Sequence, residues 1–599
     1  MKLPKSIHNF HIPVMGLAYT IDSPIRVAHY GISSVISIID DELIDKMNAF
    51  YSKKFNLPYQ EISKKAQDYR AERITSYLNL VDTIVKEKST KLRLELTESK
   101  LALEKFIATL PNKSSIKEGL SNLLNEGALK ENILNYLEKY LKAGDIDVNI
   151  MTKVDKDNFV KGEQLPIEFN DAHASLRGFA NSNLSSSVVL SAGMNPRLYS
   201  YFGKFNDFFP DRLGQLKKKI ILKVSDFRSA TIQGKFLAKK GLWVSEYRIE
   251  SGLNCGGHAF ATDGLLLGPI LEEFKNKKAT LIQDTHDVLV KALGLKEFII
   301  PEKPLDLKIT VQGGVGIADE HQFLLENYQV DSVGWGTPFL LVPEATSVDK
   351  QTRTLLANSK EEDLYLSDIS PLGVPFNTIK GTTNEYHKQK RIDNNKAGSS
   401  CPKKYLALSK EFGKEGICTA SKKYQDVKLQ ALEVKKNNLS LEVYENAKTK
   451  IYEKSCLCVG LSNASYLEND IKIKGQEQGV AICPGPNMAY FDKEVSLSKM
   501  MQHIYGNDSV LSHMNRPNMF VKELKMYVDY LKNEIDIISE EVTTKQIKKW
   551  ETFKSNLFNG IDYYQDLFLA PIYSESINIQ RELQFYKREL TAVIIPELE

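Results

Sequence analysis

The sequence predicts an α/β fold: a TIM (β/α)8 barrel with a helical insertion after strand 2 and a cysteine-containing, mainly helical C-terminal extension. Eight short apolar runs, rich in β-branched residues, alternate with helical stretches. A long Lys- and Glu-rich region separates the second run from the third, and five of the six cysteines follow the last run. Near-continuous apolar strands with helical crossovers are typical of a parallel sheet, and eight such units close into a barrel.

The expected strands follow one another in chain order. They are residues 11–18, 34–39, 148–154, 187–191, 219–224, 243–249, 309–312 and 331–333. Helical stretches lie between several of them, for example 229–240 and 319–328. The barrel domain is therefore expected to comprise residues 1–40 and 145–380. In such barrels the active site lies at the C-terminal ends of the strands.

The regions outside the barrel are expected to be helical. Residues 41–144 form the insertion, in which Ile74, Leu78, Val81 and Val85 follow helical spacing. After the barrel come a cysteine-containing segment, 381–500, and a helical region, 501–599. The helices of that last region either pack on the barrel or form a homodimer interface, and periodicity leaves both open.

Composition excludes several classes of protein. In 599 residues, 42% are hydrophobic, which is enough for a sizeable core, and the net charge is +3. Such a small charge gives no reason to expect a nucleic-acid or membrane partner. The apolar stretches are too short to span a bilayer, residues 1–10 lack the apolar core of a secretory signal, and six cysteines make no disulfide framework. We expect a cytoplasmic protein that acts on a small-molecule substrate.

Two glycine-containing strand ends predict a phosphate site. The run ITVQGGVGIADE places Gly313 and Gly314 after the seventh strand, and GWGTPFL places Gly336 and Thr337 after the eighth. Glycines let backbone N–H groups approach an anion, and a helix N-terminus adds its positive end. Two tight turns that require positive φ would explain the same glycines. Their position at the end of the strand series favours phosphate.

A second motif follows the sixth strand. It reads GLNCGGH and contains Gly256, Gly257 and His258. Paired glycines allow backbone to lie against a flat ligand, and a histidine can act as a base near neutral pH. A structural histidine is the alternative.

Taken together, these motifs resemble those of the nitronate monooxygenase (2-nitropropane dioxygenase) family of FMN-dependent barrels, which includes flavin enoyl reductases. The matching segments are IPVMGLAYTIDSP, DVNIM, KIILKVSDFRSA, GLNCGGH, QGGVGIADE and GWGTPFL, followed by VPEATSVDKQTRTLL and SPLGVPFN. The resemblance covers about residues 8–40 and 145–380, and the shared order of the motifs is more specific than any one of them.

The resemblance implies an FMN-dependent oxidoreductase and a role for each matching residue. Met15, Gly16, Asn149 and Lys223 would contact the flavin, Gly256 and Gly257 would flank it, Gly313, Gly314, Gly336 and Thr337 would hold its phosphate, and His258 would transfer a proton. The chain departs from the family pattern at Asn254 and Cys255, before the glycine pair, and at Ala259 and Phe260, after His258. These departures concern the substrate more than the flavin. Two alternatives remain open: an NAD(P)H-dependent enoyl reductase and a non-catalytic barrel scaffold.

The cysteine segment predicts a metal site. Its thiols are Cys401, Cys418, Cys456, Cys458 and Cys483. Four thiolates can hold zinc or an iron–sulfur cluster. The absence of paired CxxC motifs and the presence of Cys-Pro favour a [4Fe-4S] cluster, with Cys401, Cys418, Cys483 and one of the other two as ligands. Such a centre would exchange electrons with the flavin and a protein electron donor. Buried free cysteines are the alternative.

Overall fold

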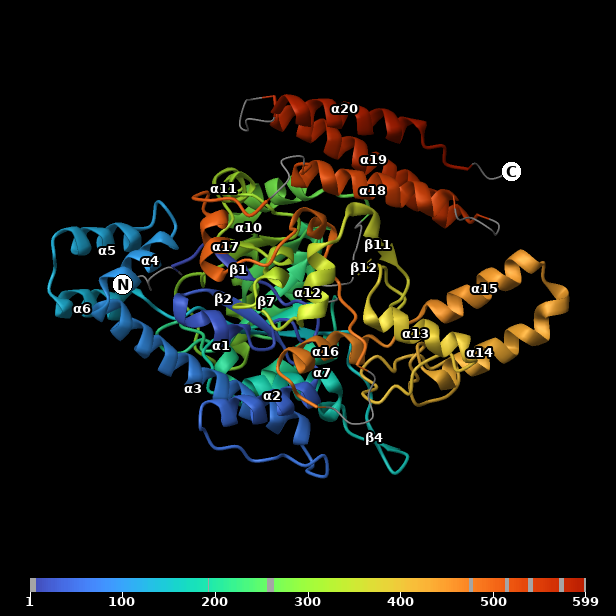
Figure 1. Cartoon of the computed structure of the whole chain (residues 1–599), viewed down its shortest axis with the longest axis horizontal. Helices are drawn as coiled ribbons and strands as arrows, with labels where there is room; N and C mark the ends of the chain where they lie inside the picture. The colour runs from blue at the N-terminus through green and yellow to red at the C-terminus, as the bar shows by residue number, and fades with distance from the viewer. Residues whose placement is uncertain are drawn as a thin grey trace.

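The barrel predicted from the sequence is confirmed. The computed structural model describes residues 7–191, 193–255, 263–472, 478–511, 516–536, 542–569 and 576–596. Eight parallel strands close into a barrel in the order β1-β10-β9-β8-β7-β6-β3-β2 (Figure 1). They are β1 (Phe10–Ile12), β2 (Ser33–Ser37), β3 (Ile146–Met151), β6 (Ser187–Ser191), β7 (Lys219–Val224), β8 (Val244–Glu250), β9 (Lys308–Gln312) and β10 (Ser332–Gly334).

The first strand is much shorter than predicted. It ends at Ile12, whereas the apolar run suggested residues 11–18. Pro13 follows directly and has no N–H to extend the ladder. Gly16 then adopts φ 56°, and the chain turns before α1 (Ser23–Val27). Of the apolar residues after Pro13, Met15 and Ala18 are buried in this turn, and Val14 and Leu17 are half-buried there.

Helices cover the outside of the barrel. Those that follow β3 to β10 are α7 (Asp171–Ala180), α8 (Pro196–Tyr201), α9 (Phe227–Ala238), α10 (Leu267–Leu295), α11 (Ala318–Asn327) and α12 (Lys350–Ala357). The small hairpin β4 (Phe159–Val160) and β5 (Glu163–Gln164) lies between β3 and α7. The predicted helices 229–240 and 319–328 correspond to α9 and α11.

Side chains inside the barrel are arranged in layers. Val35, Val189 and Ile221, from β2, β6 and β7, form a small apolar cluster of their own. Because side chains alternate along a strand, the residue two positions later faces the same way. On β7 that residue is Lys223, which lies near the C-terminal end of the strand. The apolar layer therefore forms a floor beneath the polar side chains at the barrel mouth.

Five helices lie between β2 and β3. They are α2 (Asp41–Lys54), α3 (Tyr69–Glu98), α4 (Lys100–Ala108), α5 (Ser115–Asn125) and α6 (Lys130–Tyr140). The start of α3 packs on α7 of the barrel, whereas the end of α3 and α4–α6 share a separate apolar core that includes Leu103, Leu120 and Leu137. Figure 1 shows this second part standing away from the barrel, on the left.

The region after the barrel has three parts. First comes the antiparallel hairpin of β11 (Leu364–Ser367) and β12 (Phe376–Ile379). Next come α13 (Thr383–Asp393), α14 (Lys422–Lys435), α15 (Leu441–Glu453) and α16 (Leu457–Glu468), of which α14 and α15 project to the right in Figure 1. Last come α17 (Leu497–Ile504), α18 (Met519–Asp536), α19 (Thr544–Leu567) and α20 (Ser576–Ala592).

The last three helices form a layer at the top of Figure 1. Helices α18 and α19 both contact α10 of the barrel, and α20 packs on α18 and α19. Their apolar faces are thus used within the chain, and a homodimer interface stays a prediction. Within the described residues, no helix combines the length and apolar character needed to cross a membrane.

Candidate functional site

Four polar side chains lie near the C-terminal ends of barrel strands, three of which are adjacent. They are Asn149 of β3, Lys223 of β7, Glu250 of β8 and Gln312 of β9, and we call them the mouth ring. The Lys223 ammonium lies 2.6 Å from the Glu250 carboxylate. The same Glu250 oxygen accepts hydrogen bonds from the amides of Asn254, at 2.6 Å, and Gln312, at 2.9 Å. Glu250 therefore fixes the Lys223 ammonium at the mouth.

Two amide oxygens of the mouth ring lack partners. Asn149 Oδ1 and Gln312 Oε1 are buried and make no hydrogen bond of good geometry in the part of the chain that the structure describes; the His11 ring lies beside the Gln312 side chain. Their residues are 4% and 1% exposed. A buried acceptor without a partner costs about 1–3 kcal/mol, so such atoms call for an explanation. A ligand that donates hydrogen bonds at the barrel mouth would provide one.

The two glycine-containing strand ends lie where the sequence analysis placed them. Gly313 and Gly314 follow β9 with φ 106° and 89°, conformations that other residues rarely adopt. A Cβ on Gly313 would lie 3.0 Å from the backbone N of Asn254, and one on Gly336 would lie 3.6 Å from Met15 Sδ. Gly313 thus lets its strand end approach the backbone of Asn254, and Gly336 leaves room for the Cys255 and Met15 side chains, whether or not phosphate binds.

A loop from the C-terminal region covers these strand ends. Thr337 Oγ1 donates to the Pro484 carbonyl at 2.7 Å, and the Cys255 thiol donates to the Cys483 carbonyl at 3.3 Å. The Asn487 amide donates to the Gly314 carbonyl at 2.6 Å. We call residues 481–487 the cover loop. Since the Thr337 hydroxyl is used here, only the backbone of that residue is left for a phosphate.

The segment that leads into α18 holds the cover loop in place. The Arg516 guanidinium donates to the Gly314 carbonyl at 2.6 Å and to the Asn487 amide oxygen at 3.2 Å. It also pairs with Glu320 of α11 at 2.8 Å, and both side chains are almost fully buried. Sequence reasoning missed the cover loop and Arg516. The Pro484-Gly485-Pro486 turn was a local signal for the loop, but nothing near Arg516 marks its role.

The structure describes most of the predicted flavin-site residues, but three of them lie outside the described part of the chain. Met15 is buried, and Asn149 and Lys223 lie at the barrel mouth. The residues expected to hold the phosphate follow β9 and β10 there: Gly313, Gly314, Gly336 and Thr337. Gly16 lies in the turn after β1. Gly256, Gly257 and His258 lie outside the described residues.

The cysteines do not form the set that the sequence analysis favoured. Cys483 belongs to the cover loop, beside Cys255, whereas Cys401 and Cys418 share a small core elsewhere. Among the described residues, no three His, Cys, Asp or Glu side chains are grouped so that they could hold a metal ion. Cys483 thus lies beside Cys255, apart from the core that Cys401 and Cys418 share, and a metal site on the cysteines stays a prediction.

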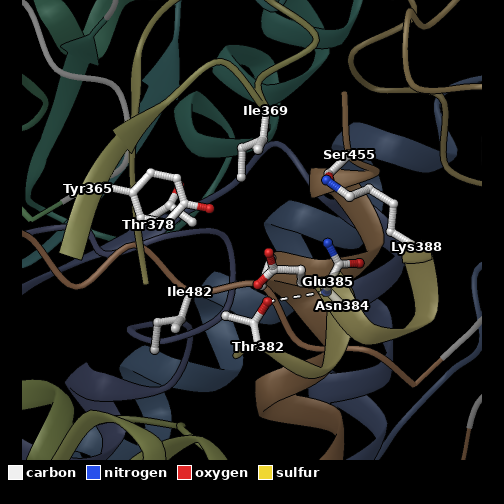
Figure 2. Close-up of a pocket in the computed structure, with 10 residues that line it drawn as sticks. Tyr365, Ile369, Thr378, Thr382, Asn384, Glu385, Lys388, Ser455 and Ile482 are labelled. Carbon is white, nitrogen blue, oxygen red and sulfur yellow. Dashed lines mark hydrogen bonds between the residues drawn. The ribbon is translucent and has the colours of Figure 1, made fainter. Parts of the chain in front are cut away.

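A small cavity lies beside the β11–β12 hairpin, and none of the mouth-ring residues lines it. Figure 2 shows it between Tyr365 and Thr378 of the hairpin, Glu385 and Lys388 of α13, and Ile482. Thr382 begins α13 by accepting a hydrogen bond from the backbone N of Glu385 at 3.2 Å. The volume of about 20 Å³ accommodates a water molecule and no substrate.

Comparison with known proteins finds similarity only among solved structures. No protein-family model matches the chain, and no curated protein matches it. The enoyl reductase domain of MlnA from the macrolactin biosynthesis cluster of Bacillus amyloliquefaciens is 15% identical with a TM-score of 0.33, over 68% of this chain and 87% of that one. For FabK of Thermotoga maritima the values are 12%, 0.30, 68% and 83%. For nitroalkane oxidase of Streptomyces ansochromogenes they are 9%, 0.28, 63% and 85%. Because these scores are low, the functional proposal rests on residues of this chain.

Proposed function

We propose that this chain is an FMN-dependent oxidoreductase. The observation that carries the proposal is the mouth ring: two buried amide oxygens without partners among the described residues, beside an oriented lysine, at the C-terminal end of a closed barrel. The isoalloxazine ring presents both a hydrogen-bond donor and acceptors along one edge. Acceptor oxygens at Asn149 and Gln312 and a donor at Lys223 fit such an edge.

The residues present fit the rest of the cofactor as well. Met15 offers an apolar contact next to Gly336, and the backbone of 313–314 and 336–337 borders the place expected for the phosphate. When bound, FMN would supply the hydride or single-electron chemistry that no side chain provides.

The protein's own residues would bind, orient and exclude water. Lys223, fixed by Glu250, would place a positive charge beside the electron-accepting ring. The cover loop, tied to Thr337 and Gly314, would close the phosphate side against solvent. His258 would move a proton to or from the substrate, as the resemblance of the GLNCGGH motif implies.

Cofactor binding is tested by titrating FMN into the purified chain and its Lys223→Met variant, followed by flavin fluorescence. Loss of a hydrogen bond from a charged group costs about 1.5–3 kcal/mol, so we expect binding at least about tenfold weaker. Lys235→Met is the matched control. Lys235 lies on α9 and pairs with Asp284 of α10 outside the barrel, so this variant should leave FMN binding unchanged. A wild-type chain that binds no FMN would overturn the proposal and favour a non-catalytic scaffold.

The reaction is tested on the FMN-loaded chain with two substrates. We propose alkyl nitronates with oxygen as the first substrate class, as the family resemblance implies. Turnover of enoyl thioesters with NADH or NADPH instead would identify an enoyl reductase. In either case His258→Asn should abolish turnover while FMN stays bound, and unchanged turnover would refute the role of His258.

A further inference from the structure

Glu523 of α18 binds two separate points of the barrel domain at once. One carboxylate oxygen accepts hydrogen bonds from Ser251 Oγ at 2.7 Å and from Gly252 N at 3.2 Å. The other oxygen accepts a hydrogen bond from Leu267 N at 2.8 Å. Glu523 is 2% exposed, so these hydrogen bonds are shielded from water. A single side chain therefore joins two points that are distant along the chain.

The two points lie on either side of the GLNCGGH motif. Ser251 and Gly252 follow β8 directly, and Leu267 is the first residue of α10. We call residues 251–267 the motif segment. The motif begins at Gly252, and its last three residues lie outside the described part of the chain. Glu523 thus fixes where the motif segment begins and where it ends.

The C-terminal helices contact the same two points of the motif segment. A Cβ on Gly252 would lie 2.6 Å from a ring carbon of Tyr527, which lies one turn after Glu523 on α18. At the other end, Gly268 N donates a hydrogen bond to the Tyr564 hydroxyl of α19 at 2.9 Å. Both ends of the motif segment are therefore packed on the layer formed by α18 and α19.

Capping of α10 alone does not account for the contacts of Glu523. The N-cap residue Leu266 makes no side-chain capping bond, and one oxygen of Glu523 provides this bond at Leu267 N. A cap requires one acceptor near the positive end of the helix. The second oxygen binds Ser251 and Gly252, which are not part of α10. Its contacts hold the opposite end of the motif segment.

These contacts lie next to the mouth ring. Ser251 directly follows Glu250, and its backbone N donates to the Gln312 carbonyl at 3.0 Å. The Ser251 hydroxyl also accepts a hydrogen bond from Leu253 N at 3.1 Å, so it connects Glu523 to the motif. The backbone of Glu250 is held independently, because it is paired with Gln312 of β9. Loss of the Glu523 contacts should therefore disturb the motif and leave the mouth ring in place.

We propose that Glu523 is a positioning residue for the proton transfer assigned to His258. This inference rests on the proposed function, because Glu523 acts through the motif segment. Only a carboxylate has acceptor oxygens on both arms, whereas the amide of glutamine has one oxygen and one NH2 group. Glu523→Gln should therefore lose the hydrogen bond from a backbone N–H at one end of the motif segment, and Glu523→Leu should lose those at both ends.

Turnover is measured on the FMN-loaded chain with an alkyl nitronate and oxygen, or with an enoyl thioester and NADPH if the wild type uses that substrate instead. A small displacement of a reacting group lowers the rate steeply, so Glu523→Gln should lower kcat at least about tenfold, with KM and FMN affinity unchanged. Asp529→Asn is the matched control, since Asp529 lies on the same helix and its pair with Lys525 is about half exposed. A purely structural role would lower the amount of FMN-loaded chain and leave kcat per bound FMN unchanged.

Hydrogen exchange followed by mass spectrometry tests the contacts without a substrate. Peptides that cover residues 250–255 and 263–268 should show faster exchange at one end in Glu523→Gln, and wild-type exchange in Asp529→Asn. If Glu523→Gln does not fold, Tyr564→Phe provides a second variant. It removes the acceptor of the Gly268 N–H and should both accelerate exchange at 263–268 and lower kcat.

Three results would overturn the inference. They are unchanged exchange at both ends in Glu523→Gln, faster exchange with the kcat of the wild type, and a loss of activity that is matched by an equal loss of bound FMN. A wild-type chain that binds no FMN would refute the proposed function, and this inference with it. Normal turnover by FMN-loaded Glu523→Gln would refute the inference alone.

Discussion

Removing one partner of the Lys403–Asp40 pair is expected to loosen the cysteine segment from the barrel. The two side chains are 0% and 1% exposed, so Lys403→Met leaves a buried carboxylate without its counter-charge. Breaking a buried pair in this way costs about 3–5 kcal/mol. Asp40 keeps hydrogen bonds from Ser462 at 2.7 Å, Leu43 N at 3.0 Å and Tyr405 at 3.1 Å, which place the cost near the lower limit.

The expected effect is a large, local increase in hydrogen exchange. A loss of about 3 kcal/mol raises the population of the locally open state roughly 100-fold, because each 1.4 kcal/mol is a factor of ten. The assay is hydrogen exchange followed by mass spectrometry on peptides that cover residues 399–407 and 456–462. Lys422→Met is the control, since its pair with Asp426 is about half exposed and contributes little.

A double variant sharpens the test. Asp40→Asn combined with Lys403→Met removes both charges, so it should exchange more slowly than Lys403→Met alone. The reasoning would be refuted if Lys403→Met raised the rate of hydrogen exchange less than about threefold. It would also be refuted if the free-energy effects of the two substitutions simply added in the double variant.

The pH dependence of this contact follows from the pKa of Asp40. Burial alone would raise that pKa, but the Lys403 ammonium and the hydrogen bonds from Ser462 and Leu43 N bring it below its usual range. The stabilisation is therefore complete above about pH 4, the unfolded pKa, and is lost as the pH falls through the folded pKa.

Two further predictions concern buried charges of the barrel. Burial and the charge of Asp145 raise the pKa of Asp147 to about 7, so the folded chain should lose stability as the pH rises from about 4 to 7. Asp147→Asn should flatten this loss in urea unfolding followed by tryptophan fluorescence, and an unchanged pH slope would contradict it. Arg516→Met leaves the buried Glu320 carboxylate without its counter-charge and should lower the free energy of unfolding by about 3–5 kcal/mol. Arg516→Lys should give a free energy between those of Arg516→Met and the wild type. Equal midpoints for Arg516→Met and the wild type would contradict the second prediction.

The barrel could be predicted because its signal is local. Each strand is a short apolar run, and the glycine pair at 313–314 lies directly after a strand. The extent of the first strand could not be judged from apolar residues alone, because buried turns are apolar as well. Pro13 was the residue that marked its end.

The rest of the site depends on contacts between distant segments. Arg516 lies about 200 residues from Gly314, and Asn487 about 170. Such contacts leave no periodicity in the sequence. The cysteines show the same limit: the sequence analysis favoured Cys401, Cys418 and Cys483 as one set of ligands, whereas the fold places Cys483 beside Cys255.

The central claim is that FMN binds at the barrel mouth. The most direct test is the visible absorption spectrum of the chain purified without oxygen and incubated with FMN, after removal of free flavin and before and after dithionite. We predict flavin bands at about one FMN per chain that bleach on reduction. A chain that retains no flavin after this treatment would contradict the account.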